Sequence, residues 1–178
     1  MLRMNPLRNS SIQDKKNNIS NGTNRALKFA FRLLKYRPRS EYELRQRLKR
    51  RGFPDPAIRE AALFLKEKKF IDDCEFARLW VECRIKRPLG IIRLRQELKI
   101  KGIDKDLIEQ ALEQASRKYN EDDVIRDLVS RRWEKLRHIE PQKARQRLFL
   151  YLLRRGFSSA KTKEALNLAF GAMHEMQH

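Results

Sequence analysis

The densest cluster of basic side chains in the sequence lies between positions 45 and 51, and its chemistry suits an anionic partner. It comprises Arg45, Arg47, Lys49, Arg50 and Arg51. Leu44 and Leu48 are four positions apart, so a helix places them on one face and leaves the cations on its other sides. Helical charge often lies on a merely solvated face, but here only Glu41 and Glu43 balance the cluster. We therefore predict that the segment binds a polyanion or an acidic protein surface.

Two acidic pairs, Asp72-Asp73 and Asp122-Asp123, have the side chains needed for metal binding or acid–base chemistry. Each pair stands where a helix is expected to begin, and carboxylates there cap free amides and favour the helix dipole. The sequence has no glycine-rich phosphate loop, no Ser/His/Asp set and no zinc-ligand spacing. We predict helix capping at both pairs, and a protein with no catalytic activity, no metal and no cofactor. Hydrolytic or metal-dependent activity of the purified protein would instead favour an enzyme.

The basic cluster belongs to a pattern that occurs three times along the chain. A leucine is followed four positions later by a second leucine, four positions later by a glycine, and then by an apolar residue. The copies are Leu44/Leu48/Gly52/Phe53, Leu94/Leu98/Gly102/Ile103 and Leu148/Leu152/Gly156/Phe157. The glycine suits the left-handed position just past a helix end, where the next residue can pack on the last turn. The glycines are 50 and 54 residues apart, a period typical of stacked helical units.

These spacings predict an all-α protein of three tandem three-helix repeats, forming an elongated body that is either straight or curved. The expected organisation is a disordered leader at 1–23, repeat 1 at 24–71, repeat 2 at 72–119 and repeat 3 at 120–178. The first helix is expected from about Asn24 to Tyr36, Ser40 should cap the second helix, and Asp55 should cap the third. One compact helical domain with a loosely attached final repeat is the alternative architecture, and a mitochondrial presequence is the alternative for the leader.

Charge is distributed unevenly over the 178 residues, which hold 42 Lys and Arg against 23 Asp and Glu. Residues 24–71 contain 15 basic and 5 acidic side chains, a net of +10, whereas residues 72–119 contain 11 and 9, a net of +2. Repeat 1 should therefore be the main electrostatic surface. In repeat 2, Arg93 can pair with Glu97, which would leave Arg95, Lys99 and Lys101 free. No apolar run resembles a signal peptide or a membrane span, so a cytoplasmic location is expected.

Three short helices that include a basic one also suggest a helix-turn-helix module. A recognition helix usually presents Asn, Gln, Ser or Arg to base edges from its first turns. The second helix here begins instead with Ser40, Glu41 and Glu43, and its carboxylates would repel phosphate. We therefore do not expect sequence-specific reading of a DNA groove.

The sequence resembles the RecX family, the bacterial regulators of the RecA recombinase. The similarity covers residues 25–115, and the end of the third repeat extends it over most of the chain. It rests on Arg39-Ser40-Glu41, Glu43-Leu44, Leu48, Asp72-Asp73, Phe76-Ala77, Arg84, Gly90, Arg93, Arg95-Gln96-Glu97-Leu98, Lys101-Gly102-Ile103 and Arg154-Arg155-Gly156-Phe157. Pro88-Leu89-Gly90 departs from the glycine-rich turn that is common in the family, and the Asn-rich leader lies outside the match.

The resemblance implies a non-catalytic protein that binds RecA and RecA-coated single-stranded DNA, and inhibits recombination, ATP hydrolysis and the co-protease activity of the SOS response. We expect this protein to be a monomer. The alternative is a DNA-binding accessory protein without sequence preference and without an obligatory protein partner. Charge and resemblance together predict a set of contacts to RecA or DNA. They are Arg37, Arg39, Arg45, Arg47, Lys49, Arg50, Arg51, Arg84, Arg95, Lys99, Lys101, Arg154 and Arg155.

Overall fold

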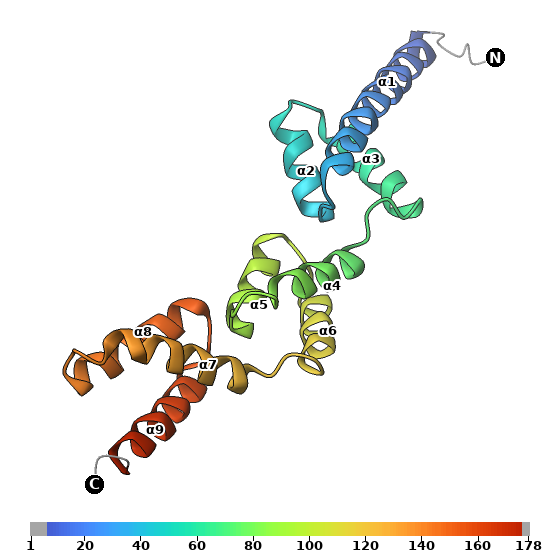
Figure 1. Cartoon of the computed structure of the whole chain (residues 1–178). Coiled ribbons are helices and arrows are strands. Elements are labelled where there is room, and N and C mark those ends of the chain that lie inside the picture. Colours follow the sequence, from blue (N-terminus) through green and yellow to red (C-terminus); the bar gives the residue numbers. More distant parts are fainter. Residues whose placement is uncertain (1–6, 176–178) are drawn as a thin grey trace. The chain divides into compact units, whose positions relative to one another are not determined.

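Figure 1 shows the computed structural model, which describes residues 7–175 and the side chains of residues 21–171. Within that range the chain forms helices and no strand, as predicted. The elements are α1 Leu7–Tyr36, α2 Glu41–Arg50, α3 Asp55–Glu67, α4 Asp73–Arg84, α5 Ile91–Ile100, α6 Lys105–Ser116, α7 Glu121–Trp133, the 3-10 turn η1 Glu134–Leu136, α8 Pro141–Arg155 and α9 Ser159–Glu175. The chain divides into two compact units, residues 1–76 (unit 1) and residues 77–178 (unit 2).

The start of the first helix was predicted wrongly. α1 begins at Leu7 rather than near Asn24, so residues 7–23 are helical and the predicted disorder does not hold for them. The sequence signal was weak because this stretch carries no apolar period. Near its end the stretch contacts α3, since the Thr23 hydroxyl donates to Glu60 at 2.6 Å. Residues 1–6 of the predicted leader lie outside the described residues.

The second helix of each repeat ends as its Leu-Leu-Gly pattern predicts. Gly52, Gly102 and Gly156 have φ values of 85°, 73° and 88°, which only glycine adopts without strain. Each glycine N–H donates to the carbonyl three residues back, and the N–H of the apolar residue after it donates to the leucine carbonyl five residues back. These two bonds form a Schellman ending, which satisfies carbonyls that a helix end leaves free.

Side-chain caps start several of the helices. Ser40 accepts from the Glu43 N–H at 3.1 Å and caps α2, as predicted. Asp104 accepts from the Asp106 N–H at 2.9 Å and caps α6. The prediction that Asp55 caps α3 is wrong, because the helix already begins at Asp55 and its cap position is Pro54, which has no side-chain bond.

Each repeat buries its own apolar face. In unit 1, Ala26 and Ala30 of α1 lie against α2 and α3, whose helices pack pairwise with α1. The other buried members of this core are Leu44, Leu48, Ile58, Ala61, Leu65 and Ile71. Small alanines let the α1 backbone approach closely, so the larger side chains of α2 and α3 fill the remaining volume.

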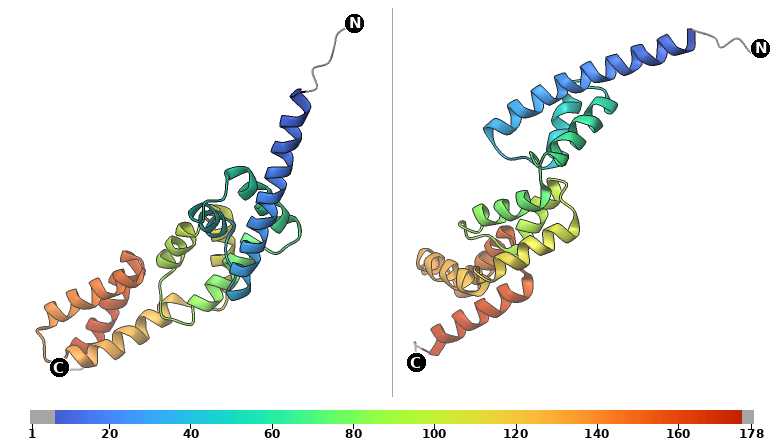
Figure 2. Two further views of the ribbon diagram at one scale, coloured as in Figure 1. Left: turned by 90° about the horizontal axis from the view of Figure 1, so that it is seen from above. Right: turned by 90° about the vertical axis from the view of Figure 1, so that its right-hand side faces the viewer.

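Unit 2 buries two further sets of apolar side chains, one in each of its repeats. In α4–α6 they include Ala77, Val81, Leu94, Leu98, Ile103, Ile108 and Leu112. In α7–α9, which contact one another pairwise (Figure 2), they are Ile125, Leu128, Val129, Leu148, Leu152, Phe157 and Leu166. The inward leucines of the repeated pattern are therefore core residues, which leaves the other faces of α2, α5 and α8 to carry charge.

Candidate functional site

The basic side chains of α2 differ in whether a carboxylate neutralises them. Leu44 and Leu48 are fully buried, so the helix has one fixed orientation. Arg47, Lys49 and Arg50 are exposed and have no ion pair with any residue whose side chain is described. We call these three residues the α2 cation cluster. A rigid helix thus presents three uncompensated cations, in agreement with the charge imbalance of the sequence.

Arg45 is neutralised within its own helix. Its Nε donates to Glu41 at 2.8 Å, and Lys66 of α3 donates to the same carboxylate at 3.2 Å. Burial alone would raise the pKa of Glu41, but the hydrogen bonds from Lys66 and Arg45 outweigh it and hold that pKa below its usual value. Arg45 is therefore a weaker candidate for an external contact than the α2 cation cluster.

The other basic residues near α2 lie in three different environments. Arg37 forms two bonds of 3.2 Å to the Glu43 carboxylate. Arg39 is half-buried, its Nε has no hydrogen-bond partner among the described residues, and burial followed by the charge of Arg37 lowers its pKa. Arg51 is exposed and lies 5.9 Å from the centre of the Phe29 ring. None of these contacts tests a functional role, so the roles of Arg37, Arg39 and Arg51 stay predictions.

In α5 the prediction of three free cations is wrong for Arg95. Arg95 donates to both carboxylate oxygens of Glu109 in α6, at 2.6 and 2.8 Å. This contact, opposed by burial, raises the pKa of Arg95 and lowers that of Glu109. The Lys101 ammonium lies 4.0 Å from the centre of the Trp80 ring, an ordinary cation–π distance. Lys99 is exposed and forms no ion pair with another described residue.

Sequence reasoning missed the substitutions that separate the two helices. When the repeats are aligned with an offset of fifty positions, Glu43 corresponds to Arg93 and Arg47 corresponds to Glu97. The sign of the charge at both positions is therefore reversed between α2 and α5. Likewise Arg59 of α3 occupies the position of Glu109, and it has no ion pair with another residue of the described range. Aligning the repeats by their glycines would have found both reversals. They leave α2 rich in free cations and α5 largely neutralised.

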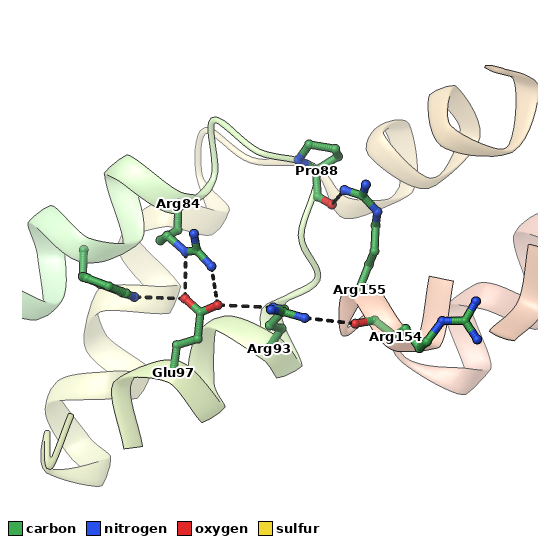
Figure 3. Close-up of polar contacts among 7 residues, drawn as sticks. Arg84, Pro88, Arg93, Glu97, Arg154 and Arg155 are labelled. Carbon is green, nitrogen blue, oxygen red and sulfur yellow. Dashed lines mark hydrogen bonds and ion pairs between the residues drawn. The ribbon is translucent and has the colours of Figure 1, made fainter. Parts of the chain in front are cut away.

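Glu97 collects three donors in unit 2 (Figure 3). Arg84 approaches it with two nitrogens, the Nε at 2.7 Å, and Arg93 donates at 3.2 Å. The indole N–H of Trp80 donates at 3.3 Å. Burial would raise the pKa of Glu97, but the hydrogen bonds from Arg84 and Arg93 outweigh it and lower that pKa. The Arg84 side chain is only 21% exposed, so the structure places this predicted contact residue inside unit 2.

A joint between repeats 2 and 3 uses the predicted contact residues Arg154 and Arg155. The Arg93 guanidinium donates to the Arg154 carbonyl at 3.2 Å, and Arg155 donates to the Pro88 carbonyl at 2.9 Å (Figure 3). The Gly90 N–H donates to the Arg155 carbonyl at 2.9 Å. The Arg154 side chain is exposed and extends away from these bonds, whereas Arg155 is half-buried. We call this set of contacts the α5–α8 joint.

Two glycines make the α5–α8 joint possible. A Cβ added to Gly90 would lie 2.0 Å from the Gly156 oxygen, and one added to Gly156 would lie 2.3 Å from the Arg93 Cβ. By contrast, a Cβ on Gly52 would meet nothing within 4 Å. Pro88-Leu89-Gly90, the segment that departs from the family's glycine-rich turn, thus brings the start of α5 against the end of α8.

The acidic pairs act at helix starts, although in a different manner from the prediction. Asp72 caps α4, but Asp73 accepts from the Glu41 N–H of α2 at 2.8 Å, and burial raises the pKa of Asp73. In unit 2, the buried Glu121 accepts from the Ile91 N–H of α5 at 2.7 Å. Asn120, rather than the pair Asp122-Asp123, caps α7. In both units a carboxylate from the next repeat therefore fixes the start of a second helix.

The described part of the chain has no group of three or more His, Cys, Asp and Glu side chains arranged to hold a metal ion. No helix within residues 7–175 has both the length and the apolar character to cross a membrane. Cys74 and Cys83 are exposed free thiols.

Three family models identify the class of protein to which these all-α three-helix repeats belong. The models describe the first, second and third three-helix domains of RecX and match residues 26–65, 72–112 and 120–166. The chain belongs to the RecX family. The predicted resemblance and the predicted tandem-repeat fold are thereby confirmed.

Curated relatives and solved structures agree with this assignment. The chain is 37% identical over 158 residues to the regulatory protein RecX of Thermotoga maritima, covering 86% of this chain and 88% of the relative. It is 34% identical over 134 residues to that of Amycolatopsis mediterranei, covering 75% and 76%. A crystal structure of RecX from Lactobacillus salivarius superposes with a TM-score of 0.70 at 23% identity, over 85% of this chain and 96% of that one. A second RecX crystal structure gives a TM-score of 0.76 at 21% identity, over 92% and 79%. The family has a regulatory role, and the two structures share the fold.

Proposed function

We propose that this protein binds RecA and the RecA–DNA filament and modulates, mainly inhibits, the recombinase, ATPase and co-protease activities of RecA. It does so in the cytoplasm, as a monomer and without a reaction of its own. Membership of the RecX family supports RecA as the partner. The physical support comes from the charge of the chain, which suits a partner made of nucleic acid and acidic protein surface.

The α2 cation cluster is the observation on which the proposal depends. Arg47, Lys49 and Arg50 are exposed on a helix fixed by two buried leucines, so presenting them costs little conformational entropy of the backbone. None of them has a carboxylate partner among the described side chains. A filament that displays phosphates or acidic residues would compensate these charges.

The second candidate is a DNA-binding accessory protein that needs no protein partner. The same cluster favours it, since phosphates alone could compensate three cations. Glu41 and Glu43 occupy the first turn of α2, where a recognition helix would meet base edges, so this binding would lack sequence preference.

A titration into RecA-coated single-stranded DNA separates the two candidates. ATP hydrolysis and filament length are followed together while the protein is kept far scarcer than the DNA sites. A regulator of the filament slows hydrolysis or shortens filaments under these conditions. Inhibition that begins only when the protein saturates the DNA would favour the accessory protein.

Matched charge variants then test the α2 cation cluster. The variant Arg47→Ala/Lys49→Ala/Arg50→Ala removes three uncompensated cations. The control Arg126→Ala/Arg131→Ala/Arg137→Ala removes three that are paired with Asp123, Asp127 and Glu134. Both variants lose three positive charges, so a difference between them reports where the charge lies and not how much is lost. Only the first variant should weaken inhibition and flatten its dependence on salt. Equal effects would show that net charge matters and the cluster does not.

A further inference from the structure

Corresponding grooves lie between the second and third helices of all three repeats. The α2–α3 groove is lined by Arg45, Gln46, Lys49, Asp55, Ile58 and Arg59, and the α5–α6 groove by Arg95, Lys99, Ile103, Lys105, Ile108 and Glu109. Each of these two grooves contains a carboxylate and no aromatic ring. The α8–α9 groove has a different lining, which comprises Gln142, Arg145, Gln146, Phe149, Lys163, Leu166 and Asn167.

One substitution changes the wall of the third groove. Phe149 follows the core leucine Leu148 as Arg95 follows Leu94, so an aromatic ring stands where the other repeats have an arginine. Phe149 is half-buried against the core of α7–α9 and also lines the groove. One part of the ring is therefore held by packing while another borders the open space.

The cations of the α8–α9 groove are not compensated by acids. Arg145 donates to the side-chain oxygen of Asn167, a neutral amide that does not compensate its charge. Lys163 is exposed and forms no ion pair with another residue in the described part of the chain. Gln142, Gln146 and Asn167 add amide groups that can both donate and accept hydrogen bonds. None of the described residues that line the groove has a carboxylate.

This combination matches one class of ligand. An aromatic face stacks on a base, amides pair with the donors and acceptors of a base edge, and cations contact phosphate. The groove volume, about 460 Å³, lies within the range of small-ligand sites. An acidic peptide would use the two cations and its backbone could bond to the amides, but its carboxylate side chains would leave the ring without a stacking partner.

We propose that the α8–α9 groove binds an unpaired nucleobase together with its phosphate, as single-stranded nucleic acid presents them. The base stacks on Phe149, its edge meets the amides, and Arg145 and Lys163 contact the phosphate. The bases of a duplex are already paired and stacked, so the groove selects single strands. This inference rests on the proposed function, because it assigns a single-strand contact to a protein that acts on RecA-coated DNA.

Binding of the full-length protein to an oligothymidylate, to a duplex of equal length and to thymidine monophosphate tests the site by fluorescence anisotropy and competition. Phe149→Leu keeps an apolar side chain but removes the ring. We expect it to weaken single-strand binding about 5- to 150-fold, the range that corresponds to loss of one base–aromatic stack, and to leave duplex binding unchanged. Phe149→Tyr should bind like the parent. Phe70→Leu, which removes an exposed ring from unit 1, is the control and should have no effect.

The cations give an independent readout on a folded background. Arg145→Gln/Lys163→Gln should reduce the slope of log affinity against log salt on single strands by about 0.7, because the two cations contact one phosphate and each neutralised phosphate adds about 0.7 to that slope. Circular dichroism and melting confirm that each variant folds. The cation pair is exposed, so it tests the site even if Phe149→Leu does not fold.

Several results would overturn this assignment. They are an equal loss of single-strand and duplex binding in Phe149→Leu, no loss in either, or competition by polyglutamate as strong as by the oligothymidylate. Thymidine monophosphate binding as tightly as the oligothymidylate would make a free nucleotide the ligand and overturn the strand as its source. Filament inhibition that is intact in Phe149→Leu, with normal single-strand binding, would reject the groove and leave the proposed function standing. Loss of inhibition in the α2 cation cluster variant, with inhibition intact in Phe149→Leu, would likewise reject the groove and leave the proposed function standing.

Discussion

The ends of α2 and α8 have the same sequence, Arg-Arg-Gly-Phe, and the same backbone, but opposite surroundings. Residues 50–53 and 154–157 both close a helix with a left-handed glycine and a Schellman pair of bonds. Around Gly52 there is open space, and Arg50 is exposed without an ion pair among the described residues. Gly156 instead lies against Arg93, and Arg155 is bonded to Pro88.

The repeated motif determines how a helix ends but not what the end is used for. Leucine spacing and glycine conformation are local, so they act alike in every repeat. The use of the neighbouring arginines depends on a residue elsewhere in the chain. For α8 that residue is Gly90, whose missing side chain admits the backbone of Gly156. The end of α2 is therefore an exposed surface, whereas the end of α8 forms part of a structural joint.

The largest effect should come from filling the space at the α5–α8 joint. Gly156→Ala forces a side chain into a left-handed conformation, about 1–2 kcal/mol, and into contact with the Arg93 backbone, about 1–3 kcal/mol. We expect a loss of about 2–5 kcal/mol in the free energy of unfolding, measured by denaturant titration. Gly52→Ala has a similar φ but open space, so its loss should be only about 1–2 kcal/mol. Equal losses in the two variants would mean that the joint does not constrain Gly156.

The next largest effect on stability should come from Glu97, which accepts a hydrogen bond from Arg93 of the α5–α8 joint. Glu97→Gln keeps the shape of the side chain but removes the charge that receives Arg84 and Arg93, which should cost about 1.5–3 kcal/mol at neutral pH. The pKa of Glu97 is lower in the folded protein than its ordinary value of 4.5. Its stabilisation is therefore complete well above pH 4.5 and is lost as the pH falls through the lowered folded pKa.

Thermal unfolding of the Glu97→Gln variant and the parent at pH 7 and at strongly acidic pH measures this dependence. The two melting temperatures should differ at pH 7 and converge in acid. Glu109→Gln is the control, because its pair with Arg95 is about 40% exposed on both sides and should contribute no more than about 1 kcal/mol. A gap that persists in acid would show that Glu97 acts through packing and not through its charge.

Much of this fold follows from sequence because its determinants are local. Gly52, Gly102 and Gly156 identify three helix ends, and the inward leucines before them identify the core face. The part that failed, the start of α1, lies in a stretch without an apolar period, where nothing local marks a helix. The site was less predictable for a physical reason. Whether Arg95 is free depends on Glu109 in another helix, and whether Arg155 is free depends on Pro88, 67 positions away.

Arg155 and Arg51 precede the glycine in the two copies. Their replacement should have a smaller effect on the free energy of unfolding, and the effect should differ between them. Arg155 donates to the Pro88 carbonyl and lies 4.9 Å from the centre of the Tyr151 ring. Arg155→Ala should therefore lower the free energy of unfolding by about 1–2 kcal/mol. Arg51, exposed over Phe29, should contribute less than about 1 kcal/mol. A matched pair of denaturant titrations decides this, and a larger loss at Arg51 would reverse the assignment of joint and surface.

The smallest effect should be a change in the salt dependence of duplex binding. Single replacements of the arginines at the ends of α2 and α8 measure it. Arg50 and Arg154 occupy the same place in the two copies, and both side chains are exposed without an ion pair to a described residue. If either contacts a phosphate, its replacement by Ala should reduce the slope of log affinity against log salt by about 0.9. Arg155→Ala should leave the slope unchanged, because its guanidinium is held inside the joint. Fluorescence anisotropy between about 50 and 200 mM salt, with all three variants on one duplex, resolves a change of this size. A slope that falls for Arg155→Ala as much as for Arg50→Ala would mean that the joint opens on DNA, and the two Arg-Arg-Gly-Phe ends would then share one function.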